Sequence, residues 1–250
     1  MDPSIILMLA ILNFFLSFYS VIVGGGALVM VPLLVSVFGV PAQSAVAISR
    51  FYNVGTGGAS LFEFTRGGKV NWRVGSSLAG CAIGGSLVGS FMVLSIDEFI
   101  LKRMIAILIV AVLVIMLTNR KLGTIEVKKC GYVKNVTGCV MVFFAIMIST
   151  MVGGGGGIFI SYILILLFGQ TFIQSMGTRK VVTIAGLISS TIFFMIAGII
   201  IYEIAIPLLI TGAIGGWAGS KFAMKRGDKW IRIFFIVVVF GMAINMFIQL

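Results

Sequence analysis

Long apolar runs fill most of this chain, and short polar or glycine-rich breaks separate them. Ten segments can be drawn, at residues 3–23, 27–38, 43–65, 74–94, 99–118, 134–152, 157–168, 172–200, 204–222 and 230–249. Most approach the roughly 20 residues that a helix needs to cross a bilayer. Segments 27–38 and 157–168 are different, because twelve helical residues span only about 18 Å of a hydrocarbon core of about 30 Å. The pattern predicts an all-α polytopic membrane protein with two short segments that tilt, re-enter or form half of a broken hairpin.

Composition narrows the class of protein further. The chain is 60% hydrophobic and 10% charged, with a mean hydropathy of +1.21, which leaves no room for a sizeable soluble domain. The net charge of +11 comes mostly from clustered Lys and Arg, and without a soluble basic module we expect no nucleic-acid partner. The chain has no His, and its three cysteines lack metal-site spacing, so no metal or other cofactor is expected. We expect these cysteines to act as small apolar residues.

The basic clusters predict the orientation of the segments. They lie at residues 66–73, 120–134 and 221–232, where we expect cytoplasmic loops. Counting segments from these loops places both termini outside and gives the two halves the same plan in opposite orientation. Such an inverted-topology repeat, with about five segments in each half, is a common architecture of secondary transporters. We therefore divide the chain into a first repeat at 1–122, a cytoplasmic basic linker at 123–133 and a second repeat at 134–250.

Matching residues support this duplication. Several short sequences recur in the same order at offsets of 130 or 131 residues. The pairs are Gly24–Gly26 with Gly154–Gly156, Phe38-Gly39 with Phe168-Gly169, Gln43-Ser44 with Gln174-Ser175, Ala82–Gly85 with Ala213–Gly216, and Gly89-Ser90 with Gly219-Ser220. The first pair interrupts an apolar run in each half. Glycine interruptions at corresponding positions of two halves are a pointer to a transporter's binding site.

These interruptions and the basic residues that follow them predict an anion site. The short segments begin near Ala27 and Gly157, where unpaired N–H groups and the helix dipole favour an anion. Arg50 and the Arg179-Lys180 pair lie inside later segments at matching places, and charges within the membrane usually serve a function. A planar guanidinium suits an anion with several oxygens. The predicted substrate-binding residues are Gly24, Gly25, Gly26, Gln43, Ser49, Arg50, Asn53, Gly154, Gly155, Gly156, Gln174, Thr178, Arg179 and Lys180.

Simpler explanations remain open for some of these residues. Arg50 could extend to the outer surface, and Arg179 and Lys180 could anchor the inner surface. The glycines at 80, 84, 85 and 89, and those at 212, 215, 216 and 219, have the spacing of close helix packing. Glu63 is expected at a cytoplasmic helix end, with a proton carrier as the alternative.

The glycine stretches resemble a known family. The sequence from Val23 through Pro32 to Leu34, and that from Val152 to Ile163, each followed by Gln-Ser, resemble the sulfite exporter TauE/SafE family over nearly the whole chain. The resemblance implies transport of small anions across the plasma membrane, chiefly sulfur-containing ones such as sulfite, thiosulfate and sulfoacetate. Tyr162 stands where the first repeat has Pro32, and Gly177–Lys180 departs from the family's usual Gly-Thr-Ser-like stretch.

We therefore expect a secondary transporter in the plasma membrane that moves a small sulfur oxyanion or organosulfonate by alternating access. Its partners would be the anion and the lipid bilayer. ATP is not expected as a driver, because no nucleotide-binding loop is present in the sequence. Two alternatives remain: an anion channel with the same site, and a non-transporting assembly factor or subunit of a membrane complex. An enzyme is not expected, because the chain lacks His and any paired acid.

Overall fold

The computed structural model describes residues 3–23, 27–101, 103 and 132–248, and within them every long regular element is a helix. The helices are α1 (Pro3–Val23), α2 (Ala27–Ser36), α3 (Ala42–Arg66), α4 (Trp72–Ser95), α6 (Tyr132–Met151), α7 (Gly157–Phe168), α8 (Phe172–Ile196) and α9 (Tyr202–Ile248). The predicted all-α class is confirmed. The predicted segment at 99–118, the linker at 123–133 and the glycines at 24–26 lie wholly or largely outside the described residues.

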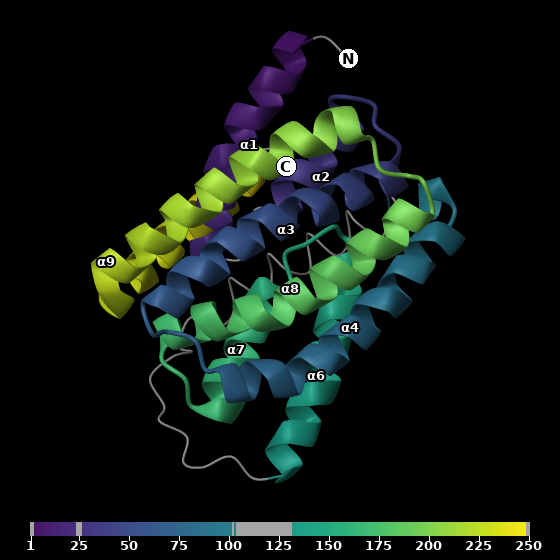
Figure 1. The fold of residues 1–250 in the computed structure, drawn as a ribbon. Coiled ribbons are helices and arrows are strands. Elements are labelled where there is room, and N and C mark those ends of the chain that lie inside the picture. Colours follow the sequence, from purple (N-terminus) through teal and green to yellow (C-terminus); the bar gives the residue numbers. More distant parts are fainter. Residues whose placement is uncertain (1–2, 24–26, 102, 104–131, 249–250) are drawn as a thin grey trace.

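The boundary between the last two predicted segments contains no non-helical residue. The sequence suggests separate segments at 204–222 and 230–249, and the structure assigns helix to every residue of α9 from Tyr202 to Ile248, while the last part of α9 runs back toward the end where α9 begins (Figure 1). The basic stretch between the two apolar runs consists mostly of Lys, Arg, Met and Ala, which are good helix formers, and it contains no proline. These residues therefore keep a helical backbone assignment where a loop was predicted.

Helix ends follow local sequence signals. The side chain of Asn71 accepts a hydrogen bond from the backbone of Val74 at 3.2 Å and caps the start of α4. Thr171 and Gln174 form a capping box at the start of α8. Left-handed glycines follow the ends of α2, α3, α7 and α8, and because only glycine adopts this backbone easily, they end these helices. They are Gly39, Gly68, Gly169 and Gly198, with φ of 64°, 62°, 62° and 68°.

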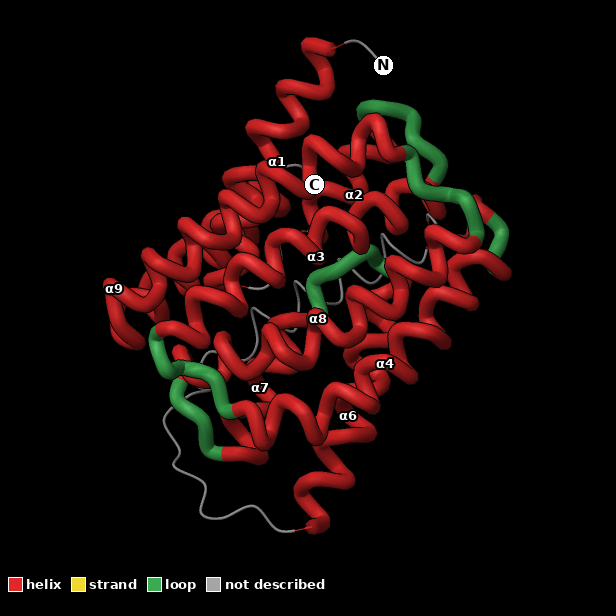
Figure 2. The backbone as a smooth tube through the Cα atoms, viewed as in Figure 1, coloured by secondary structure: helices red, strands yellow, loops and turns green. Residues whose placement is uncertain are grey.

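Six of the helices lie side by side in the order α1, α9, α3, α8, α4, α6 (Figure 1), and each neighbouring pair is in contact. Helix α2 packs on α1 and α3, and α7 packs on α6 and α8. The middle of the row is therefore the contact between α3 and α8, one from each half of the chain. Figure 2 shows loops at two opposite ends of the molecule and one loop near its middle, between α6 and α7.

Glycines bring the outer helices close together. A Cβ added at Gly89 of α4 would lie 2.6 Å from the carbonyl oxygen of Met147 in α6. A Cβ added at Gly219 of α9 would lie 2.6 Å from the carbonyl oxygen of Phe18 in α1. Gly85 and Gly215 make the equivalent close approaches to Phe143 and Phe14. The packing prediction is thus confirmed for these glycines but not for Gly80, which has open space around it.

The expectation for two of the cysteines is wrong. Cys81 of α4 and Cys139 of α6 form a disulfide, with their Cα atoms 5.6 Å apart. The close approach of these helices at the glycines of α4 brings the two cysteines, 58 positions apart, into reach. Sequence spacing carried no sign of this pairing. Cys130 lies outside the described residues.

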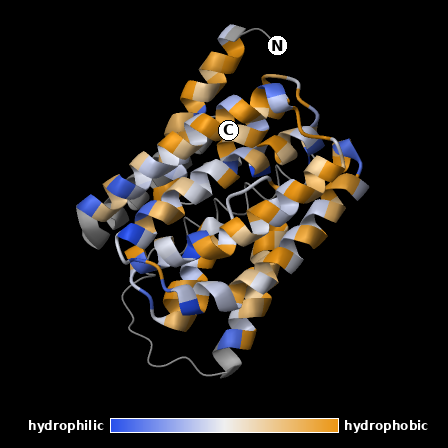
Figure 3. Ribbon diagram, viewed as in Figure 1, coloured by the Kyte–Doolittle hydropathy of each residue, from blue (hydrophilic) through white to orange (hydrophobic). Residues whose placement is uncertain are grey.

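The outer surface of this bundle is apolar. Large hydrophobic side chains such as Phe91, Phe144 and Ile210 are more than half exposed, as is usual for a face that meets lipid. Four helices, within Ser4–Ile22, Trp72–Ser95, Phe172–Ile196 and Tyr202–Lys225, are long and apolar enough to cross a membrane. Figure 3 shows hydrophobic positions along the helices and hydrophilic positions mostly near their ends.

Candidate functional site

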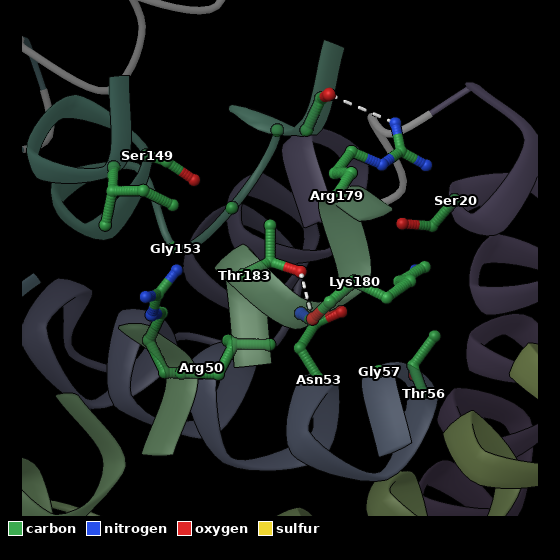
Figure 4. Close-up of a pocket in the computed structure, with 15 residues that line it drawn as sticks. Ser20, Arg50, Asn53, Thr56, Gly57, Ser149, Gly153, Arg179, Lys180 and Thr183 are labelled. Atoms are coloured by element: carbon green, nitrogen blue, oxygen red, sulfur yellow. Dashed lines mark hydrogen bonds between the residues drawn. The ribbon is translucent and has the colours of Figure 1, made fainter. Parts of the chain in front are cut away.

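A small polar cavity lies where α3 and α8 meet, with the α6–α7 break on its other side (Figure 4). Its volume is about 60 Å³, which leaves room for only a few water-sized groups. Basic side chains enter it from two helices: Arg50 from α3, and Arg179 and Lys180 from α8. No Asp or Glu is among the described residues that line it. Among the described residues, the cavity therefore combines three buried basic side chains with no acidic side chain.

Arg50 is held by serines on two other helices. Its side chain is 3% exposed, its Nε donates to Oγ of Ser190 at 2.9 Å, and its Nη2 donates to Oγ of Ser86 at 3.2 Å. Both serine hydroxyls donate in turn to the carbonyl oxygen of Gly186, at 2.9 Å and 2.5 Å. The lone pairs of the two serines are thereby directed at the guanidinium. Arg50 does not extend to the outer surface, and within the described residues its guanidinium makes only these two hydrogen bonds.

Arg179 reaches to three parts of the chain. Its Nη1 donates to the carbonyl oxygen of Gly157 and to Oγ of Ser161, both at 3.1 Å. Its Nη2 donates to the carbonyl oxygen of Val21 at 2.8 Å. Val21 lies in the last turn of α1, and Gly157 is the first residue of α7. Arg179 thus links α8 to one helix beside each glycine break, α1 at the first and α7 at the second.

Lys180 is buried without a partner for its charge. Its side chain is 7% exposed. Within the described part of the chain, its ammonium group makes no hydrogen bond or ion pair. Its backbone carbonyl accepts a hydrogen bond from the hydroxyl of Thr183 at 3.3 Å. A buried, uncompensated cation costs several kcal/mol. An anion in the cavity would offset that cost.

The α6–α7 break forms the opposite wall. Gly153 and Gly155 have φ of 82° and 90°, a region that other residues enter only with strain. The backbone N–H of Gly156 donates to Oγ of Ser149 at 3.1 Å, and the carbonyl oxygen of Gly153 accepts from Oγ of Ser49 at 2.7 Å. Gly154, Gly155 and Gly157 line the cavity, so the N-terminal end of α7 faces the cations. A positive helix end and cations on one cavity suit an anion.

The structure brings together Arg50, Asn53, Gly154, Gly155, Arg179 and Lys180 from the predicted set. Ser49 and Gly156 lie next to the cavity through the bonds just described. The remaining described residues make structural hydrogen bonds away from the cavity instead. Gln43 donates to the carbonyl oxygen of Ile96, Gln174 belongs to the capping box of α8, and Thr178 accepts from the backbone N–H of Asn71. Gly24, Gly25 and Gly26 lie outside the described residues.

Several lining residues were not among the predicted ones. They are Ser20, Thr56, Gly57, Ile146, Ser149, Gly153, Gly157, Thr183 and Leu187. Gly57, Thr183 and Leu187 follow Arg50 or Lys180 at one-turn or two-turn spacing on the same helix, and Thr56 follows Asn53 by one turn, a signal that could have found them. Ser20, Ile146 and Ser149 come from α1 and α6, and only tertiary packing brings them here. Glu63 is not at the cavity, and its carboxylate accepts from Nε1 of Trp217 at 2.7 Å.

Comparison with known proteins agrees with this architecture. The family model described as sulfite exporter TauE/SafE matches residues 9–246. The chain belongs to the sulfite exporter TauE/SafE family. It is therefore a membrane transporter by family and, with its several apolar helices, a multi-pass membrane protein.

Curated relatives of this TauE/SafE chain carry similar descriptions. A probable membrane transporter protein of Haemophilus influenzae is 26% identical over 235 residues, which is 94% of this chain and 91% of the relative. Another, from a Sinorhizobium species, is 19% identical over 93% of this chain and 88% of its own length. The probable membrane transporter protein YfcA of Escherichia coli K12 is 22% identical over 88% of this chain and 81% of its own length. No solved structure matches the chain.

Proposed function

We propose that this TauE/SafE chain is a secondary transporter that moves a small anion across the plasma membrane by alternating access, with both termini outside. The anion would be a sulfur oxyanion or an organosulfonate such as sulfite, thiosulfate or sulfoacetate. The cavity between α3 and α8 would be the binding site, and the two halves of the chain would rock around it as inverted repeats.

The observation that carries this proposal is the absence of a counter-charge. Arg50, Arg179 and Lys180 line one cavity, and no carboxylate is among its described lining residues. Charged side chains in the membrane interior usually face partners or ion pathways. A bound anion supplies such a partner, and the fork of Arg50 matches two oxygens of one oxyanion. The small cavity volume favours an anion of few atoms, so sulfite and thiosulfate fit more readily than a bulky sulfonate.

Several features support two repeats related by a shift of 130 residues. The starts of α2, α3 and α4 and those of α7, α8 and α9 differ by this number, at 27 and 157, 42 and 172, and 72 and 202. The helix contacts also correspond, because α4 packs on α6 and α8 as α9 packs on α1 and α3.

Equivalent connections lie at opposite ends of the molecule, which favours inverted orientation. The α2–α3 connection lies beside the end of α4, where the backbone N–H of Ala42 donates to Oε1 of Glu98 at 3.3 Å. The α7–α8 connection leads into α8 beside the α3–α4 loop, where Thr178 bonds Asn71. Since α3 separates these two ends, the repeat-related connections face opposite sides. The basic loop at 66–73 would then mark the cytoplasmic side.

A flux measurement on the purified chain in liposomes tests the proposal. Vesicles containing the protein should take up labelled sulfite with saturable kinetics, and unlabelled thiosulfate should compete better than chloride. Empty vesicles and vesicles that contain the Arg50→Ala variant are the controls. A large unsaturating anion current would favour the channel alternative. No uptake above that of empty vesicles would contradict transport and favour an assembly role.

A further inference from the structure

The two adjacent basic residues of α8 make different contacts. A shift of 130 residues pairs Lys180 with Arg50 and Arg179 with Ser49. In each half, the first residue of the adjacent pair makes different contacts from the second. Resting on the proposed anion site, we propose that Arg50 and Lys180 form the recognition pair for the anion. Ser49 and Arg179 are then positioning residues, each of which binds the end of the first helix of the opposite repeat, and we call each of these contacts a clasp.

Each half of the chain supplies one of these contacts. Ser49 of α3 donates to the carbonyl oxygen of Gly153, two residues beyond the end of α6. Arg179 of α8 donates to the carbonyl oxygen of Val21, in the last turn of α1. Each donor therefore belongs to one repeat and meets the carbonyl end of the first helix of the other. Those ends carry partial negative charge and unpaired carbonyls, which such donors stabilise.

The short helices complete each clasp at matching positions. Ser161 of α7 accepts from Arg179 at 3.1 Å. The residue 130 positions earlier is Val31 of α2, and a Cβ added at Gly153 would lie 2.5 Å from its Cγ2 atom. Each clasp thus joins three helices, and in the second repeat much of the donor capacity of Arg179 is used by protein oxygens. These hydrogen bonds hold the guanidinium of Arg179 at the wall of the cavity.

Lys180 shows the opposite situation. It is 7% exposed, lines the cavity and has no described partner for its ammonium group. The serines that hold Arg50 have no full counterpart here, because the residues equivalent to Ser190 and Ser86 are Ser60 and Gly216. The hydroxyl of Ser60 already donates to the carbonyl oxygens of Thr56 and Gly216, at 2.5 Å and 3.1 Å. Lys180 is therefore a charge on a flexible stem opposite the fixed fork of Arg50.

Variants at the two positions separate these roles. Lys180→Met should weaken equilibrium binding of sulfite to the purified chain about tenfold or more, as expected for loss of a charged hydrogen bond. It should leave the melting temperature of the ligand-free chain unchanged or higher, because an uncompensated buried charge is removed. Lys180→Arg should retain sulfite affinity within a few-fold.

Arg179→Gln should give the reverse pattern. The melting temperature of the ligand-free chain should fall, and sulfite affinity, measured well below melting, should change less than in Lys180→Met. The clasp also predicts faster maleimide labelling of the cysteine in Ser20→Cys when Arg179→Gln is added, but not when Lys180→Met is added. A role confined to general stability would not move that labelling rate at low temperature.

One result would overturn the inference. Lys180→Met would then keep the sulfite affinity of the wild type, while Arg179→Gln would lose sulfite affinity and keep the melting temperature of the wild type. Failure of the proposed function has a separate signature, in which the wild-type chain binds none of sulfite, thiosulfate and sulfoacetate. The melting temperatures and labelling rates then still decide the clasp, since neither measurement needs a ligand.

Discussion

Arg50→Ala should lower the affinity of the purified chain for sulfite by about 30-fold or more, which corresponds to about 2 kcal/mol or more of binding free energy. The guanidinium is held in place by Ser190 and Ser86, so little is lost in ordering it when an anion binds. Truncation removes both the charge and the fork that could meet two oxygens of one oxyanion. Isothermal titration of the detergent-purified variant measures the change.

Two controls sharpen this result. Arg66→Ala removes a cation that is exposed at the end of the same helix, and it should leave sulfite affinity within about twofold. Arg50→Lys keeps a charge but loses the fork geometry, and its affinity should be intermediate. Equal affinity in Arg50→Ala and Arg66→Ala would contradict a role for Arg50 in binding.

Gly153→Ala should both destabilise the chain and weaken anion binding. With φ of 82°, alanine at this position carries a backbone cost of about 1–3 kcal/mol. Its Cβ would also lie 2.5 Å from Cγ2 of Val31 and 3.3 Å from the Cβ of Ser49, so the break must shift away from α2 and α3. That shift moves the wall of the cavity. Thermal melting in detergent, followed by sulfite titration at low temperature, measures the two effects.

Gly80→Ala is the matched control for this substitution. Gly80 lies within helix α4, and a Cβ added there has open space. Alanine should therefore leave the melting temperature unchanged or raise it slightly, because it lowers the entropy of the unfolded chain. Similar melting temperatures for Gly153→Ala and Gly80→Ala would show that the backbone at the break is not held as described.

Local pattern was enough to predict most helices. The start of α7 at Gly157 and both ends of α1 follow directly from apolar runs and glycine breaks. Hydropathy predicts where a helix can lie in a membrane because each residue's transfer free energy is largely a local property. It does not predict whether a basic stretch is a loop or keeps helical backbone, since Lys and Arg are also good helix formers, as the basic stretch within α9 shows.

The site was predicted less completely, because its geometry depends on tertiary contacts. Arg50 and Lys180 were found as charges within apolar segments. Their different surroundings could not be predicted from the sequence, because Ser86 and Ser190 reach Arg50 from two other helices. Gln174 and Thr178 were predicted as polar neighbours of the charges, but each satisfies a backbone group near the start of a helix. Polar residues near a charge in sequence are often local caps, which sequence alone separates poorly from ligands.

The central claim is that one small anion binds in the cavity between α3 and α8. Equilibrium binding of labelled sulfite to the purified chain tests it most directly, with the wild type compared with the double variant Arg50→Ala/Lys180→Met. We expect saturable binding of one sulfite per chain in the wild type and none detectable in the double variant, while both remain folded. Undiminished binding in the folded double variant would contradict it.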